Sequence, residues 1–202
     1  MIKLAITSNI KKYYKGYIDF IDHYWIEAFE KKKINYSLLP NNIILSRKIL
    51  KKNNLLILAG GNDIITNKKD SKLRNKIENN LIKEAIKLKI PIIGICRGAQ
   101  LLNLYFGGKI RKIRSHMRTR HNIFLEKNEI IRMNKLNVNS FHNYGIGPKD
   151  LSKKLKVIGT DGKKNVEMYL LKEKKILGIM WHPERELNLK ILFQLINFYK
   201  KW

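Results

Sequence analysis

The residues with the clearest capacity for chemistry centre on Cys96, the single cysteine of the chain. It stands in the run Gly-Ile-Cys-Arg-Gly (94–98), after a short apolar stretch that predicts a strand and before a stretch, 99–106, that predicts a helix. Glycines on either side allow a side chain to stand on a tight strand-to-helix turn. At a helix N-terminus the free N–H groups and the macrodipole favour a thiolate. A lone cysteine is more often a small buried hydrophobe, but this frame favours a nucleophile.

A nucleophilic cysteine needs a base, and His182 is the best placed of the five histidines. It follows the apolar run 176–181, so it is expected at the carboxyl end of a strand, where ligands bind in open α/β sheets. Pro183 fixes the local turn, and Glu184 is close enough in sequence to orient the imidazole and stabilise its charged form. A single histidine at a strand edge is normally structural. Together with a cysteine on a strand-to-helix turn (an elbow), the pattern predicts catalysis by Cys96, His182 and Glu184.

The remaining chemistry-bearing residues argue against a metal centre. The histidines and acidic residues lack compact ligand spacing, and the only cysteine is already assigned. The expectation is therefore an enzyme with no metal and no cofactor.

The elements that must position these residues alternate along the first half of the chain. Strands are predicted at 2–7, 34–39, 55–59 and before Cys96, with helices at 13–33, 43–51, 72–88, 99–106 and 188–199. The second half predicts short strands with turns between them, at 121–125, 129–133, 137–139, 155–160, 167–171 and 176–180. Such a sequence predicts an α/β fold with a mostly parallel sheet, a smaller antiparallel portion in the second half, and one domain over 1–202.

The formal charge of +26 over 202 residues would suit a polyanion partner, but the lysines are scattered through every segment. Without a basic helix or a zinc knuckle, nucleic-acid binding is not favoured, while attraction of an anionic substrate is. One cysteine excludes an internal disulfide and fits a reducing compartment such as the cytoplasm. No apolar run approaches the roughly 20 residues that span a bilayer. The sequence leaves open whether the chain forms a homodimer.

Five motifs in order carry a family resemblance: Gly-x-Cys-Arg-Gly-x-Gln at 94–100, Asn-Leu-x-x-Gly-Gly at 103–108, Asn-Ser-x-His at 139–142, Asp-Gly at 161–162 followed by Glu167, and Trp-His-Pro-Glu at 181–184. Together they resemble the class I glutamine amidotransferases, and within these the gamma-glutamyl hydrolase branch, peptidase family C26. The resemblance runs over nearly the whole chain. It implies a three-layer, flavodoxin-like sandwich around the central sheet.

The resemblance also implies roles. Cys96 would attack the gamma-carbonyl of a glutamyl group to form a thioester, His182 would move the proton and activate water, and Glu184 would hold the histidine. The oxyanion hole would be the backbone N–H groups of Gly61 and Arg97, although Asn62 replaces a third glycine usual there. Residues expected to bind the glutamyl substrate are Gly60, Gln100, His142, Asn143 and Tyr144.

A finer resemblance concerns the leaving group. The runs 118–121, 140–145 and 179–186 are similar to hydrolases that act on gamma-glutamyl-CDP-amidate in capsule phosphoramidate pathways and release glutamate and cytidine diphosphoramidate. It assigns Arg118, Arg120 and His121 to the substrate, and guanidinium groups suit a pyrophosphate. A solvated basic loop is an equal alternative.

Three other functions stay open. The first is a glutaminase subunit that delivers ammonia to a separate synthase. Arg97, which replaces the small or apolar residues common in such subunits, favours a hydrolase instead. The second is a hydrolase of another gamma-glutamyl amine such as gamma-glutamyl-GABA. The third is a non-enzymatic binding module, which would not need Cys96, His182 and Glu184 together.

Overall fold

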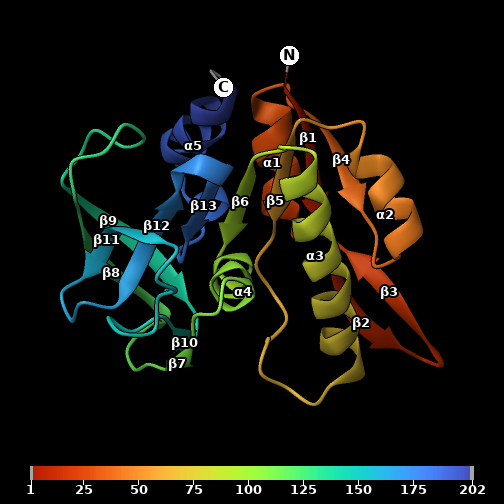
Figure 1. Ribbon diagram of the computed structural model, residues 1–202, viewed down its shortest axis with the longest axis horizontal. Helices are drawn as coiled ribbons and strands as arrows, with labels where there is room; N and C mark the ends of the chain where they lie inside the picture. Colours follow the sequence, from red (N-terminus) through yellow and green to blue (C-terminus); the bar gives the residue numbers. More distant parts are fainter. Residues whose placement is uncertain (1, 201–202) are drawn as a thin grey trace.

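The computed structural model describes residues 2–200, which build a nine-stranded sheet flanked by helices (Figure 1). Five neighbouring strands run parallel, in the order β4 (Asn35–Leu39), β1 (Lys3–Thr7), β5 (Leu55–Leu58), β6 (Ile92–Ile95) and β13 (Ile176–Ile179). The sheet continues with four antiparallel strands, β12 (Val166–Leu171), β11 (Lys156–Asp161), β8 (Met117–Leu125) and β9 (Lys135–Phe141). The antiparallel portion expected in the second half is therefore an extension of the main sheet.

Helices cover both faces of the sheet. Leu55 and Ile57 belong to the core that includes α1 (His23–Lys31) and α5 (Lys190–Lys200). Leu56 and Leu58 belong to the core under α2 (Ile43–Leu50), α3 (Lys69–Lys87) and α4 (Arg97–Tyr105). Successive strand residues face opposite sides, so a fully apolar strand needs cover on both faces. The α/β fold with three layers is confirmed.

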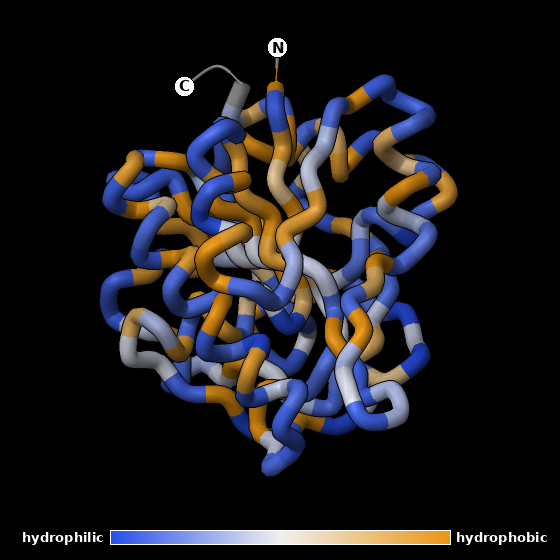
Figure 2. The backbone as a smooth tube through the Cα atoms, turned by 90° about the vertical axis from the view of Figure 1, so that its right-hand side faces the viewer, coloured by the Kyte–Doolittle hydropathy of each residue, from blue (hydrophilic) through white to orange (hydrophobic). Residues whose placement is uncertain are grey.

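These two cores supply the main stabilising term. Figure 2 shows apolar segments concentrated in the interior and hydrophilic segments toward the periphery. Each Leu, Ile or Phe side chain that is fully buried contributes about 1.5–3 kcal/mol relative to leaving it exposed.

The prediction of one helix over 13–33 is wrong for its first part. A hairpin of β2 (Asn9–Tyr13) and β3 (Gly16–Phe20) comes first, and α1 begins only after Asp22, whose side chain accepts a hydrogen bond from the Tyr24 N–H. The hairpin leaves Tyr17 and Ile18 on the surface, so their spacing does not mark a buried helix face.

The strand predicted at 129–133 is also wrong. Asn128 Oδ1 accepts hydrogen bonds from the N–H groups of Ile130 and Ile131, at 2.9 and 2.8 Å. An asparagine side chain that binds the following backbone in this way replaces the ladder of a strand with a turn.

Short elements complete the second half. β7 (Arg111–Lys112) pairs with β10 (Tyr144–Gly145), and two 3-10 turns, η1 (Lys172–Lys174) and η2 (Pro183–Arg185), flank β13.

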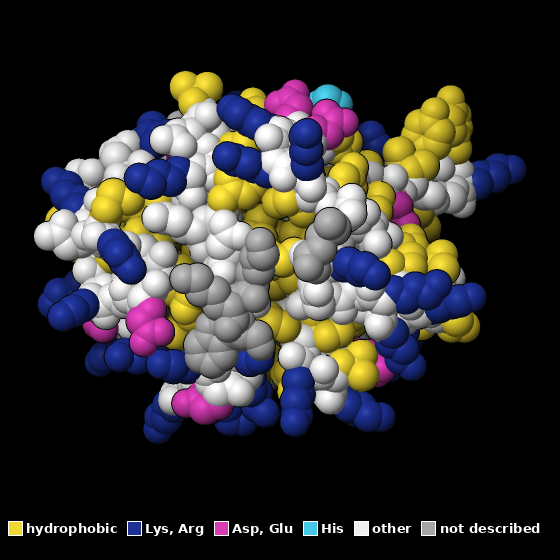
Figure 3. Space-filling view, turned by 90° about the horizontal axis from the view of Figure 1, so that it is seen from above, with side chains coloured by type: hydrophobic (Ala, Val, Ile, Leu, Met, Phe, Trp, Pro, Cys, Tyr) yellow, Lys and Arg dark blue, Asp and Glu magenta, His cyan; other side chains and the backbone are white. Residues whose placement is uncertain are grey.

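The surface carries its positive charge diffusely. Figure 3 shows lysine and arginine side chains along much of the visible outline of one face, with few acidic groups among them. Over residues 2–200, none of the helices combines the length and the apolar character that crossing a membrane requires.

Candidate active site

Cys96 lies on the sharp turn that joins β6 to α4. Its backbone has φ 49° and ψ −102°, a conformation that non-glycine residues rarely adopt and that costs about 1–3 kcal/mol. The Cys96 N–H donates to the Ile179 carbonyl at 2.7 Å, which fixes the turn to the neighbouring strand β13. A Cβ on Gly98 would lie 2.8 Å from Leu58 Cβ, so only glycine lets α4 approach β5 this closely. The elbow predicted from the glycine spacing is present.

His182 comes three residues after Ile179, the last residue of β13, which pairs in parallel with β6. Cys96 and His182 therefore lie at the same edge of the sheet. His182 Nδ1 lies 2.7 Å from Glu184 Oε1, and the two residues are 4 % and 3 % exposed. Burial opposes charge on the imidazole, but the Glu184 carboxylate and then Cys96 raise the pKa of His182 to about 10. The three predicted catalytic residues thus lie together.

The backbone of His182 is held by Asn139, which lies within β9. The His182 N–H donates to Asn139 Oδ1 at 2.9 Å, and Asn139 Nδ2 donates to the His182 carbonyl at 2.8 Å. Glu186 Oε1 accepts from Asn139 Nδ2 at 2.7 Å, and Arg120 pairs with Glu186 at 3.2 Å. Sequence reasoning noted Asn139 only as part of a motif and gave Glu186 no role.

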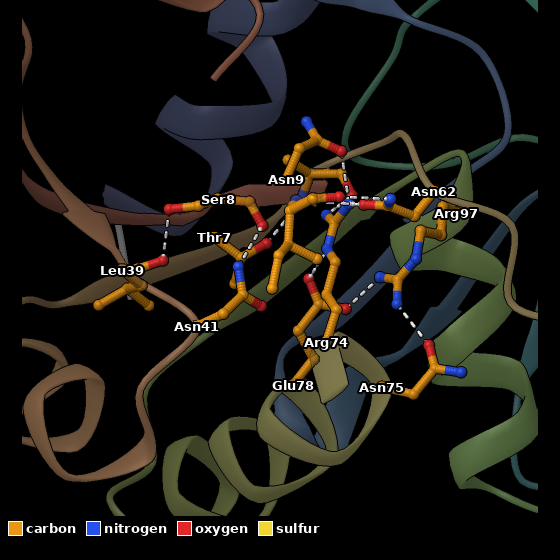
Figure 4. Close-up of polar contacts among 12 residues, drawn as sticks. Thr7, Ser8, Asn9, Leu39, Asn41, Asn62, Arg74, Asn75, Glu78 and Arg97 are labelled. Carbon is orange, nitrogen blue, oxygen red and sulfur yellow. Dashed lines mark hydrogen bonds and ion pairs between the residues drawn. The ribbon is translucent and has the colours of Figure 1, made fainter. Parts of the chain in front are cut away.

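The Gly60–Gly61 turn after β5 faces this pair. A Cβ on Gly60 would lie 2.6 Å from His182 Cε1, so the imidazole packs directly on this glycine. Gly61 has φ +109°, in the region that favours glycine. Arg74 donates to the Gly60 carbonyl at 3.2 Å and to the Ala59 carbonyl at 2.8 Å. Figure 4 shows Arg74 with its polar partners Asn9, Asn62 and Glu78. Because a trans peptide places its C=O and N–H on opposite sides, the Gly61 N–H points away from Arg74.

Arg74 belongs to a buried network on α3 that sequence reasoning missed. Glu78 accepts from Arg74 Nε at 2.9 Å and pairs with the guanidinium of Arg97, which also binds Asn75. Burial would raise the pKa of Glu78, but Arg74 and Arg97 lower it. Burial lowers the pKa of Arg74 to about 10, which leaves it charged at neutral pH. The i,i+4 spacing of Arg74 and Glu78 is visible in the sequence, but their burial is not.

These contacts also fix the direction in which the Arg97 side chain points. Its side chain is 2 % exposed and turned into the Glu78 network, so it does not face a substrate. Its backbone N–H stands in the first turn of α4, where N–H groups lack helical partners.

A small pocket opens at Cys96. Besides Cys96 and Arg97, five predicted site residues line it: Gly61, Gln100, His142, Asn143 and Tyr144. The Gln100 side-chain amide donates to the Tyr144 carbonyl at 2.7 Å, which ties α4 to the segment after β9. Met117 and Phe141 also line the pocket and were missed.

A wider hollow lies on the other side of Phe141, whose ring is 5.7 Å from the His182 ring. It is lined by basic, aromatic and polar residues: Tyr24, Arg118, Thr119, Arg120, Asn139, Phe141 and Arg185. The Arg185 guanidinium lies 4.9 Å above the Phe141 ring.

The three residues assigned to the leaving group separate in the fold. Arg118 is exposed in this hollow and has no ion-pair or hydrogen-bond partner in the described part of the chain. Arg120 is held by Glu186 and by Asn137, whose Oδ1 accepts from Arg120 Nε at 2.8 Å. His121 points elsewhere, toward Glu167 and the ring of His116.

The fold is the one found in glutamine amidotransferases. A Thermoplasma acidophilum protein described as one of the subunits of GMP synthase superposes with a TM-score of 0.79 at 20% identity, covering 100% of this chain and 95% of that one. A glutamine amidotransferase of Thermotoga maritima superposes with a TM-score of 0.70 at 19% identity, covering 99% and 83%. At these identities the likeness shows the fold alone.

The sequence defines the family. The Peptidase C26 profile matches residues 6–184, and the chain belongs to this family. The gamma-glutamyl-CDP-amidate hydrolase of Campylobacter jejuni is 35% identical over 149 residues, which cover 73% of this chain and 68% of that protein. These findings support a hydrolase that acts on the C–N bond of a gamma-glutamyl amide.

Proposed function

We propose that this chain is a cysteine hydrolase that cleaves a gamma-glutamyl amide through a thioester on Cys96 and releases glutamate. The observation that supports it most is the position of Cys96 on a strained elbow beside the buried His182–Glu184 pair. A thiol, a base and an orienting carboxylate are the three parts that nucleophilic acyl transfer needs. A free catalytic thiol also fits a reducing compartment such as the cytoplasm.

In the first half-reaction His182 already holds the proton of the Cys96–His182 pair, and the Cys96 sulfur attacks the gamma-carbonyl carbon. The oxyanion that forms is held by the backbone N–H groups of Gly61 and Arg97, the first of which is oriented by Arg74. The C–N bond then breaks, and His182 gives its proton to the departing nitrogen.

In the second half-reaction His182 takes a proton from water, which attacks the thioester carbonyl. The C–S bond breaks, and glutamate leaves while the proton returns to the Cys96–His182 pair. Glu184 stabilises the imidazolium in both halves because its carboxylate lies 2.7 Å from Nδ1. The glutamyl group would lie in the pocket along Gln100, Asn143 and Tyr144.

For the leaving group we propose a nucleoside diphosphate joined through nitrogen, as in the substrate named for the Campylobacter jejuni relative. The hollow beyond Phe141 supports it. Arg118 offers a guanidinium with no partner in the described part of the chain, and Arg185, which pairs with Asp22, lines the same hollow. Guanidinium groups bind phosphate oxygens in a bidentate manner, and the half-exposed ring of Tyr24 offers a face for a base.

The experiment is a comparison of glutamate release from gamma-glutamyl-CDP-amidate, glutamine and gamma-glutamyl-GABA. Cys96→Ala is expected to lose turnover of every substrate with an unchanged circular dichroism spectrum. Arg118→Ala is expected to raise KM for the nucleotide conjugate about tenfold and leave gamma-glutamyl-GABA unaffected. Arg132→Ala, which removes an exposed arginine from a loop that does not line the hollow, is the matched control.

Near-normal turnover by Cys96→Ala would remove the nucleophile assignment. Preference for glutamine would favour a glutaminase subunit, and preference for gamma-glutamyl-GABA another hydrolase. Equal effects of Arg118→Ala on both kinds of substrate would remove the pyrophosphate role.

A further inference from the structure

A second group of chemistry-bearing residues lies in the antiparallel half of the sheet, apart from Cys96. His116 precedes β8, His121 lies within β8, and Glu167 lies on β12. His116 and Glu167 are 3 % and 1 % exposed. The sequence showed no compact ligand spacing here, and folding corrects that expectation. One ligand atom from each of the three residues lies within 4.8 Å of the others.

The atoms of this His116–His121–Glu167 cluster face each other without hydrogen bonds. Glu167 Oε1 lies 3.5 Å from His116 Nε2 and 3.6 Å from His121 Nε2, beyond the usual range of a hydrogen bond. Within residues 2–200, neither carboxylate oxygen of Glu167 has a hydrogen-bond partner. A fully buried carboxylate without a hydrogen bond needs a cation close to it, and either a protonated histidine or a metal ion can supply that charge.

The hydrogen bonds around the cluster set the ring tautomers. His116 Nδ1 lies 2.9 Å from the Arg114 carbonyl, and His142 Nδ1 lies 3.0 Å from the Tyr144 carbonyl. A carbonyl only accepts, so each Nδ1 carries the hydrogen. In the neutral ring, His116 Nε2 then presents a lone pair toward Glu167 and toward Asp161 Oδ2, 3.0 Å away. Histidine ligands of metals are oriented in this way, by donating their other ring N–H to a backbone carbonyl.

We propose that His116, His121 and Glu167 bind a divalent transition metal ion, with Zn²⁺ the best match. Zinc takes nitrogen at about 2.0–2.1 Å and carboxylate oxygen at about 2.0–2.2 Å in a tetrahedron, whose ligand atoms are then about 3.4 Å apart. The separations of 3.5 and 3.6 Å fit such edges. Asp161 Oδ2 or a water would complete the four ligands.

The metal would act on structure rather than on the reacting bond. It would join β8 to β12, which are separated in the sheet by β11. His142, whose ring lies 5.2 Å from that of His116, also lines the Cys96 pocket together with Tyr144. Loss of the ion is expected to loosen this side of the substrate pocket before it affects Cys96 itself.

A proton is the competing occupant. Burial opposes protonation of His116, but Asp161 and Glu167 raise the pKa of His116 to about 10. Without metal, a charged His116 therefore forms an ion pair with these carboxylates. Measuring the metal content of the protein therefore distinguishes a bound metal ion from a bound proton, without reference to catalysis.

The test measures metal in the purified full chain by mass spectrometry, then titrates chelator-treated protein with Zn²⁺ against a competing dye. We expect one ion per chain. His121→Ala and Glu167→Gln are expected to weaken Zn²⁺ binding by more than about 100-fold, beyond the 10–100-fold effect of outer-shell changes. His23→Ala, on the exposed first turn of α1, is the matched control and should bind as the wild type does.

Cys96→Ser separates this site from the catalytic one and should retain full binding. Wild-type protein that neither contains nor takes up Zn²⁺ would overturn the proposal, as would binding that His121→Ala leaves intact or that Cys96→Ser abolishes. Since His121 is partly exposed, its replacement is the milder variant if Glu167→Gln fails to fold. The readout is Zn²⁺ binding and does not involve glutamate release. The outcome for the metal site is therefore independent of the outcome for the proposed function.

Discussion

The charge on His182 is set by two neighbours acting against its burial. Only 4 % of the residue is exposed, and desolvation alone would keep the ring neutral. Glu184 and Cys96 outweigh this effect and raise the pKa of His182 to about 10. At neutral pH the ring is therefore charged, which suits a thiolate–imidazolium pair of the kind that cysteine hydrolases use.

Replacing Glu184 by Gln tests this balance. The amide has nearly the same shape but no charge, so desolvation should prevail and the pKa of His182 should fall below neutrality. Titration of the His182 ring by NMR should show a charged ring at pH 8 in the wild type and a neutral one in Glu184→Gln. We expect kcat/KM to fall by about 10²–10⁴-fold, as when a triad carboxylate is replaced by an amide.

The same pair predicts a dependence of stability on pH. The folded-state pKa of His182, about 10, lies above the ordinary value of 6.5, so its stabilisation is complete below pH 6.5 and is lost as pH rises toward 10. The difference in unfolding free energy between wild type and Glu184→Gln should shrink over that interval. A constant difference would show that Glu184 stabilises the fold by packing alone.

At the residue scale, the sequence predicted the residues around Cys96 better than those around the leaving group. The glycine frame and the Trp-His-Pro-Glu run are local patterns, and the structure places their residues together. Arg120 and His121 lie on the same strand, β8, but successive side chains of a strand face opposite sides. One therefore lies in the hollow beyond Phe141 and the other points toward Glu167.

Among the elements, the turn between β6 and α4 depends on the close approach of α4 to β5. In Gly98→Ala the new methyl group would meet the backbone carbonyl and Cβ of Leu58, both on a buried strand. The helix would have to shift, at a cost of about 1–3 kcal/mol of stability, and Cys96 would move with it. The urea concentration at the midpoint of unfolding and kcat should both fall.

Gly162→Ala is the matched control for Gly98→Ala. A Cβ at Gly162 would meet nothing within 4 Å. The two variants add the same methyl group, so a similar loss in both would show that the approach of α4 to β5 is not tight.

Helix α3 supports the Gly60–Gly61 turn through one buried carboxylate. Glu78→Gln leaves the guanidinium groups of Arg74 and Arg97 buried without their counter-charge. Removal of one partner from a buried pair costs about 3–5 kcal/mol. Glu129→Gln breaks only an exposed pair with Lys172 and should cost at most about 1 kcal/mol. Urea unfolding of both variants measures the difference, and equal losses would contradict a supporting role for α3.

The elements themselves were predictable where burial on both faces produced an unbroken apolar run, as in β5 and β6. The hairpin of β2 and β3 was not, because Tyr17 and Ile18 fit a helical pattern yet face solvent. Pattern reasoning assumes that apolar residues are buried, and this hairpin does not follow that assumption.

For the whole molecule, the net charge of +26 creates a field that extends beyond any one contact. Basic side chains are scattered over the face seen in Figure 3, so on this face the attraction for small anions is not confined to one site. Cys96 and His182 are buried, and buried pairs feel dissolved salt much less than exposed charges do.

Salt should therefore slow the capture of a charged substrate and not its chemistry. Between about 50 and about 500 mM KCl, kcat/KM for gamma-glutamyl-CDP-amidate should fall several-fold while kcat stays constant, because screening shortens the reach of the field. With gamma-glutamyl-GABA, which lacks the diphosphate, kcat/KM should change little. Arg118→Ala removes one of the 26 net charges, so it should lower kcat/KM for the nucleotide conjugate at every salt concentration. The slope of kcat/KM against salt concentration should stay as in the wild type. If the slope disappears in Arg118→Ala, the attraction is local to the hollow beyond Phe141, and the dispersed lysines have no part in capture.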